Sequence, residues 1–291
     1  MEIRAAATLA TSHLFVPLNH AFPSSSVRVL SCSDLKHSVS VASTRPIPRP
    51  QSRKSTPAHG FSRAKMSVAA PESLIAAKKK AAEVLDDMRG TSIFLVGMNS
   101  TLKTDMGKIL ADSLRYYYFD SDSLVEQAAG GASAAKSYRV EDEKGFQESE
   151  TEVLKQLSSM GRLVVCTGDG AVQSSINLSY IRYGISIWVD LPLDYLANEL
   201  LMSEVSSPTT GITLESESFS KVLDELMQRY NELKEGFATA DATVSLQKVA
   251  SQLGYDDLTS VTPEDMALEV LNEIQRLTRV KKMMEEAGRP F

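Results

Sequence analysis

Residues 92–104 decide the fold of this chain, and they read Ser92-Ile93-Phe94-Leu95-Val96-Gly97-Met98-Asn99-Ser100-Thr101-Leu102-Lys103-Thr104. The first five form a short apolar run, which is typical of a buried strand. A loop that begins with glycine follows, and a helical pattern of apolar residues then covers 103–115. A strand, a glycine-led loop and a helix in this order are how a nucleotide-binding α/β domain begins.

The loop at 97–104 nearly matches the phosphate-loop pattern G-x-x-x-x-G-K-[ST]. Gly97, Lys103 and Thr104 stand at the required positions, so we expect Lys103 to pair with nucleotide phosphates and Thr104 to reach Mg²⁺. Leu102 replaces the second glycine. A leucine held there in a left-handed conformation would cost about 1–2 kcal/mol, and its side chain would crowd the phosphate. The alternative is an ordinary strand-to-helix loop in which the Lys-Thr pair is incidental.

Strand and helix patterns alternate along the rest of the chain. Apolar runs predict four further strands, at 116–119, 163–166, 185–189 and 242–246. Periodic patterns predict helices at 71–88, 144–160, 217–236 and 263–281, and a polar stretch lies at 203–216. Nearly continuous apolar strands that alternate with helices predict a three-layer α/β fold, with a parallel sheet flanked by helices on both faces.

The first 66 residues differ in composition from the rest. They contain nine Lys or Arg and two acidic residues, a net charge of +7, which leaves −13 for the remainder of a chain whose total is −6. They also contain twelve serines and six prolines. Rich in serine and arginine and poor in acid, 1–66 is predicted to be a disordered chloroplast transit peptide that precedes a folded body at 67–291. A basic tail that binds something acidic is the alternative.

The composition of the body excludes several classes of function. An acidic body is unsuited to nucleic acid, and no run of 18 apolar residues predicts a membrane span. All four histidines precede residue 67, which excludes histidine-assisted nucleophiles and histidine-ligated zinc from the body. Cys166 is the only cysteine of the body, so an internal disulfide is excluded as well.

Short segments in a fixed order carry a family resemblance. They lie at 97–104, 107–108, 119–122, 145–146 with Glu150, 168–172, 191–192 and 242–246. Together they resemble the shikimate kinase family over about residues 90–250. The resemblance implies the phosphate-loop fold of nucleoside monophosphate kinases, with ATP and Mg²⁺ as cofactors and the stretch at 203–216 as a lid.

Two carboxylates match catalytic positions of that family. The resemblance implies that Asp120 helps to organise Mg²⁺ and that Asp122 acts on the hydroxyl group that receives the phosphate. A carboxylate can orient or deprotonate a nucleophile in phosphoryl transfer. The alternative is that Asp120 or Asp122 only caps the helix that follows.

The cations that the family uses are missing. The resemblance implies arginines that hold the carboxylate of shikimate or contact the nucleotide, and these positions fall at Gln147, Ser207, Leu233 and Glu199. Residues 203–216 contain no Lys or Arg at all. A glycine-rich loop of the family is interrupted here by Asp169, whose negative charge would repel an anionic substrate. Shikimate is therefore not expected to bind, and Asp122 is expected to be vestigial.

We expect a catalytically inactive member of the family, similar to the inactive shikimate-kinase-like group of plant plastids. That similarity implies a binding or regulatory role in chloroplast development, with an unidentified protein partner in the stroma and weak or no binding of ATP and Mg²⁺. A second hypothesis is a phosphate-loop kinase or NTPase with a neutral or cationic acceptor. A third is an active shikimate kinase that recruits Lys234.

Overall fold

The computed structural model describes residues 72–205 and 216–288. Its contacts divide the chain into Met1–Thr56 and Pro57–Phe291, and all the described residues belong to the second unit. The predicted transit peptide at 1–66 and the lid residue Ser207 lie outside the described residues.

The described body is built on one five-stranded sheet. Its strands are β1 (Ile93–Val96), β2 (Tyr117–Asp120), β3 (Leu163–Cys166), β4 (Ile185–Asp190) and β5 (Ala242–Ser245). They stand in the order β2-β3-β1-β4-β5, and every neighbouring pair is parallel. All residues of β1 and β3 are buried, as expected for the centre of a sheet that is covered on both faces.

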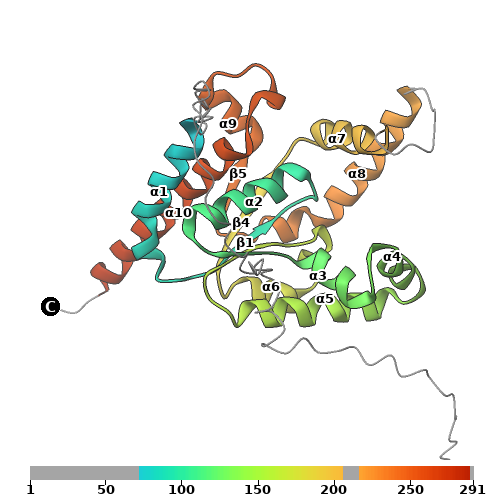
Figure 1. Cartoon of the computed structure of the whole chain (residues 1–291), viewed down its shortest axis with the longest axis horizontal. Helices are drawn as coiled ribbons and strands as arrows, with labels where there is room; N and C mark the ends of the chain where they lie inside the picture. The colour runs from blue at the N-terminus through green and yellow to red at the C-terminus, as the bar shows by residue number, and fades with distance from the viewer. Residues whose placement is uncertain (1–71, 206–215, 289–291) are drawn as a thin grey trace, which may run out of the picture. The chain divides into compact units, whose positions relative to one another are not determined.

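Helices cover both faces of this sheet. They are α1 (Glu72–Met88), α2 (Thr101–Leu114), α3 (Ser121–Ala129), α4 (Ala132–Glu141), α5 (Glu143–Ser158), α6 (Ser175–Ile181), α7 (Leu193–Val205), α8 (Ser216–Phe237), α9 (Leu246–Leu253) and α10 (Pro263–Ala287). Helix α2 packs against α1 and α10, while α5 packs against α3 and α6 (Figure 1). The predicted three-layer α/β fold is confirmed.

The segment after β2 differs from the predicted helices, because α4 was not predicted and α3 was considered only as the helix that Asp120 or Asp122 would cap. Helix α3 is short and is defined by its two caps. Asp120 accepts a hydrogen bond from the Ser123 backbone N–H, and Gly130 ends the helix in a left-handed conformation. Only Ser121 and Val125 of this helix are buried, so its apolar pattern is too brief to predict a helix.

The last helix is longer than predicted. Helix α10 begins where the sequence places it, with a capping box between Thr262 and Asp265, but it continues to Ala287 rather than ending near residue 281. Its buried residues stop at Ile274, and Met283 and Met284 are exposed. The last turns therefore lack the buried stripe on which the prediction depended.

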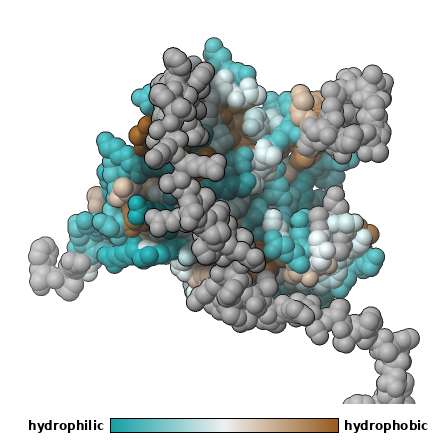
Figure 2. All heavy atoms as spheres, viewed as in Figure 1, coloured by the Kyte–Doolittle hydropathy of each residue, from teal (hydrophilic) through white to brown (hydrophobic). Residues whose placement is uncertain are grey.

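Hydrophilic residues cover most of the described surface that Figure 2 shows. Among the described helices, none combines the length and the apolar character that a membrane span requires.

Candidate functional site

The topology brings four loops to one edge of the sheet. Because the strands are parallel, the segments that follow β1, β2, β3 and β4 leave from the same edge, and β1 lies between β3 and β4. A pocket of about 450 Å³ opens there. It is lined by Asn99, Ser100, Thr101, Lys103, Thr104, Asp105, Lys108, Asp120, Asp122, Glu199 and Leu200. The predicted Lys103, Thr104, Asp120 and Asp122 are thus together.

The first glycine of the phosphate loop is required by both its conformation and its surroundings. Gly97 has a φ of 135°, which L side chains rarely adopt. A Cβ at this position would lie 2.5 Å from the carbonyl oxygen of Val189 in β4. The loop therefore turns directly against the neighbouring strand, and this brings its backbone over the end of the sheet.

Leu102 does not disturb the loop in the way the sequence suggested. It lies in the first turn of α2 and is absent from the described non-glycine residues with positive φ. Its side chain is only 5% exposed and belongs to the hydrophobic core. The expectations that Leu102 would be left-handed and would crowd the phosphate are both wrong, because α2 starts early enough to hold residue 102 in helical geometry.

Lys103 is buried and fully engaged. Its Nζ donates hydrogen bonds to the carbonyl oxygens of Gly97 (2.8 Å) and Thr167 (2.9 Å) and to the Asn99 Oδ1 (3.1 Å). Three donors meet three acceptors, so the ammonium group is satisfied within the protein. Burial lowers the pKa of Lys103, while the nearby carboxylates of Asp122 and Asp169 oppose that change.

Asn99 links the phosphate loop to the predicted catalytic carboxylate. Its amide accepts from Lys103 and also donates from Nδ2 to the Asp122 Oδ2 at 3.1 Å. The sequence analysis did not single out Asn99, because the phosphate-loop pattern leaves its position open. The signal was the amide side chain itself, which can donate and accept at once.

Asp122 is held close to the loop that follows β3. A Cβ on Gly168 would overlap the Asp122 carboxylate, so only glycine allows this approach. Burial raises the pKa of Asp122, and the charges of Asp120 and Asp169 raise it further against the hydrogen bond from Asn99. The position suits a proton acceptor at the edge of the pocket, and the raised pKa is typical of functional carboxylates.

We expect Asp122→Asn to raise the melting temperature by a few degrees at neutral pH. A carboxyl with a raised folded pKa stabilises the fold while protonated, and this stabilisation is lost as pH rises through the folded pKa. The amide is uncharged and still accepts from Asn99, so its advantage should disappear below the ordinary Asp pKa of 3.8. Thermal unfolding across pH measures this, with the exposed Asp194→Asn as control. A gain that does not depend on pH would contradict it.

Asp120 has a structural role at its position. Its Oδ1 accepts from the Ser123 N–H at 2.9 Å and caps α3, which is the capping alternative that the sequence left open. Asp120 and Thr104 both line the pocket. Their side-chain oxygens suit Mg²⁺, which usually takes one or two carboxylates together with phosphate oxygens. The described residues contain no cluster of three metal-ligating side chains, so a nucleotide would have to complete the coordination.

Two backbone donors at the start of α2 are already in use. The Lys103 N–H donates to the Ser100 Oγ at 3.0 Å, and the Thr101 N–H donates to the Glu199 Oε1 at 2.5 Å. Glu199 reaches this point from α7. In a phosphate loop, such N–H groups are the ones that bind phosphate.

A neighbouring pocket of about 220 Å³ lies beside the loop after β3. It is lined by Phe146, Gln147, Glu150, Asp169, Gly170, Gln173 and Arg229. The Arg229 Nε lies 3.3 Å from the Asp169 Oδ2, and its Nη1 lies 3.8 Å from the Glu232 Oε2. The guanidinium is thus shared between two carboxylates.

The structure separates the predicted substrate-site residues. Gln147 and Asp169 line this pocket, whereas Leu233 is only 1% exposed and lies in the core. Arg229, one turn earlier on α8, stands nearer the edge where the loops meet, and the sequence analysis missed it. One helical turn moves a side chain by about 5.4 Å, so a small error of alignment exchanges a core position for a pocket position. Lys234, the suggested replacement cation, lies over the Tyr230 ring at 5.9 Å.

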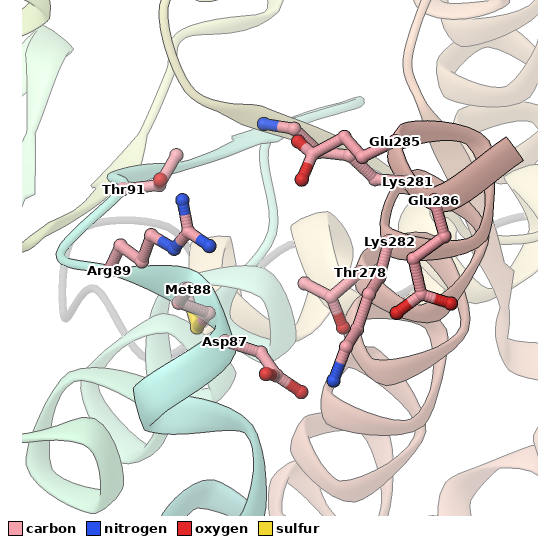
Figure 3. Close-up of a pocket in the computed structure, with 9 residues that line it drawn as sticks. All are labelled: Asp87, Met88, Arg89, Thr91, Thr278, Lys281, Lys282, Glu285 and Glu286. Atoms are coloured by element: carbon pink, nitrogen blue, oxygen red, sulfur yellow. The ribbon is translucent and has the colours of Figure 1, made fainter. Parts of the chain in front are cut away.

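A further hollow of about 190 Å³ lies away from these loops, between the end of α1 and the last turns of α10 (Figure 3). Arg89, Lys281 and Lys282 line it together with Asp87, Glu285 and Glu286. Three cations facing three carboxylates give no net charge, and the hollow includes none of the residues that follow the strands. The chemistry of the protein is therefore expected at the phosphate loop and its neighbouring pocket.

This combination defines a class of protein: an α/β protein with a phosphate loop, of the kind that kinases of small molecules use. A family profile described as "Shikimate kinase" matches residues 99–256. The chain is 52% identical over 226 residues to "Probable inactive shikimate kinase like 1, chloroplastic" of Arabidopsis thaliana, covering 78% of this chain and 77% of that protein. The chain belongs to the shikimate kinase family.

Other relatives carry different names. "Shikimate kinase 2, chloroplastic" of Oryza sativa is 40% identical over 198 residues, which cover 68% of this chain and 64% of the relative. Among solved structures, a shikimate kinase from Acinetobacter baumannii in complex with shikimate matches with a TM-score of 0.50 at 24% identity, over 67% of this chain and 97% of that one. The predicted fold is confirmed by this likeness.

Proposed function

We propose that this chain keeps the shikimate kinase fold but does not phosphorylate shikimate, and that it acts in the chloroplast stroma by binding a protein partner in chloroplast biogenesis. One observation supports this most strongly. The pocket beside the loop after β3 is here called the substrate-side pocket. Arg229, the cation among the described residues that line it, is paired with Asp169 and Glu232. A cation that already has two carboxylate partners is a poor receptor for the carboxylate of shikimate.

The magnitudes favour loss of shikimate binding. A hydrogen bond to a charged group contributes about 1.5–3 kcal/mol, so two missing arginine contacts weaken binding by about 3–6 kcal/mol. Asp169 adds repulsion in the same pocket, because like charges brought together at a binding site are unfavourable by several kcal/mol. These effects need not add, but either one alone is comparable with the roughly 4–8 kcal/mol that binds a small acid at millimolar to micromolar Kd.

Nucleotide binding is proposed to be weak. The family normally uses ATP and Mg²⁺, and Lys103, Thr104 and Asp120 are in position to contact them. The ammonium of Lys103 and the N–H groups of Thr101 and Lys103 have internal partners instead, which a nucleotide would have to displace.

The proposed location rests on the first 66 residues and on the relatives. The segment has the composition of a transit peptide, and the relatives from Arabidopsis and rice carry the word chloroplastic in their names. We propose that 1–66 directs import and is removed, and that 67–291 is the mature protein.

A second function has an observation of its own. Lys103, Thr104, Asp120 and Asp122 line a single pocket, which is the set that a phosphate-loop kinase needs. Because Asp169 lies in the substrate-side pocket, the acceptor of such a kinase would be neutral or cationic. A screen of plastid metabolites with MgATP tests it, and phosphoryl transfer that disappears in Lys103→Ala would favour it over the binding role.

The binding role is tested by affinity capture from chloroplast stroma. Tagged 67–291 should retain at least one protein that an active plastid shikimate kinase, used as bait under the same conditions, does not retain. The shared fold of the two baits controls for unspecific contacts. Identical sets of captured proteins would contradict a specific partner.

A further inference from the structure

We propose that Glu199 occupies the phosphate position at the start of α2, so that the protein excludes nucleotide from its own phosphate loop. This inference concerns the nucleotide side of the pocket. It goes beyond the loss of shikimate binding and does not depend on it.

The contact between Glu199 and α2 has the chemistry of phosphate binding. The Glu199 Oε1 accepts from the Thr101 N–H at 2.5 Å, and Thr101 is the first residue of α2. Hydrogen bonds to an ionised acceptor are shorter and stronger than neutral ones. The positive end of the helix dipole favours a negative charge at this point. A carboxylate oxygen therefore takes the place that a phosphate oxygen needs.

Two other donors of the loop, the backbone N–H and the ammonium group of Lys103, also have partners within the protein. The Ser100 Oγ accepts from the Lys103 N–H, and three protein oxygens accept from the Lys103 Nζ. The loop therefore has no need of a bound anion to satisfy these donors, whereas an open phosphate loop presents them to its ligand.

The second carboxylate oxygen of Glu199 weakens the contact. The Glu199 Oε2 is buried and has no hydrogen-bond partner among the described residues. A buried polar atom without a partner destabilises the arrangement that holds it. The internal contact is thus weaker than that of a carboxylate whose two oxygens both have partners.

The charge of the pocket adds to the exclusion. Four carboxylates line it, including Glu199, against two lysines, and one of these, Lys108, is paired with Asp105 at 2.9 Å. A polyphosphate that enters meets an excess of negative charge. Removal of the Glu199 charge lowers this excess and frees the Thr101 N–H at the same time.

The test compares nucleotide affinity in matched variants of 67–291 by calorimetry. Glu199→Gln removes the charge and keeps the shape, Glu199→Ala removes both, and Asp194→Asn removes an exposed charge from the first turn of the same helix. Inorganic tripolyphosphate and MgADP are the probes, and thermal unfolding confirms that each variant folds. We expect both Glu199 variants to bind both probes at least about tenfold tighter than wild type, with Asp194→Asn unchanged.

Equal affinity of wild type and both Glu199 variants would overturn the proposal, and so would an equal gain in Asp194→Asn. A second readout needs no variant to fold: the Thr101 amide proton of the wild type should exchange slowly with solvent, because it is hydrogen-bonded to Glu199. Unprotected exchange there would also overturn it. Shikimate turnover by wild type would refute the proposed function but leave this comparison of affinities intact.

Discussion

Purified 67–291 is expected to phosphorylate shikimate at least about 10³-fold more slowly than an active plastid shikimate kinase assayed beside it. Two independent losses support this figure. The cation of the substrate-side pocket, Arg229, is paired with Asp169, and the positions that the family resemblance assigns to further arginines hold Gln147 and Glu199. Removal of an arginine that stabilises the transferring phosphate lowers the rate by about 10³–10⁵.

A coupled assay of ADP release with shikimate and MgATP measures this turnover. Lys103→Ala is the control, since it removes the phosphate-loop lysine and reports any contaminating kinase of the expression host. Turnover of wild type that exceeds this variant and lies less than about 10³-fold below that of the active enzyme would contradict the expectation.

Gly97→Ala is expected to lower the free energy of unfolding by about 3 kcal/mol or more. The substitution meets two obstacles at once. The φ of 135° is unfavourable for any L side chain, and the new Cβ would lie 2.5 Å from the Val189 carbonyl oxygen, a backbone atom of β4 that cannot turn away. Relief would require β1 and β4 to separate at the centre of the sheet. Urea unfolding measures the loss.

Gly254→Ala is the matched control for that measurement. Gly254 also has a positive φ, of 74°, but a Cβ there meets nothing within 4 Å. It carries the conformational penalty alone, about 1–2 kcal/mol. Equal losses in the two variants would mean that the close contact with Val189 contributes nothing.

The parallel sheet and its edge were predictable because they follow from local patterns. The apolar run of β1, the glycine-led loop and the start of α2 are contiguous in sequence, and β2, β4 and β5 each end in a polar residue. Parallel strands bring these loop ends together whatever their order. The meeting of Lys103 with Asp120 and Asp122 could therefore be predicted without coordinates, and the pocket confirms it.

The contacts made by the loop residues could not be predicted in this way. Whether Leu102 is strained depends on where α2 begins, and the Ser100 cap places it within the first helical turn. Arg229 and Leu233 are one turn apart on α8, and only their depth beside the sheet separates a pocket cation from a core residue. Sequence spacing does not report that depth.

The Glu199 contact depends on a pairing between distant elements. Helix α7 and the start of α2 are 98 residues apart at this hydrogen bond, and no local pattern relates them. The sequence showed that a carboxylate stands at residue 199, and its charge was counted as a loss. Because the Glu199 carboxylate accepts from the Thr101 N–H, we infer that the same charge also occupies the phosphate position.

Calorimetric titration of shikimate into 67–291, in the presence of saturating Mg²⁺, tests the central claim most directly, because it examines the pocket of Asp169 and Arg229 without requiring turnover. An active plastid shikimate kinase serves as the reference. We predict no measurable binding up to millimolar shikimate. Binding within tenfold of the reference affinity would contradict the claim that this chain has kept the fold and lost the substrate.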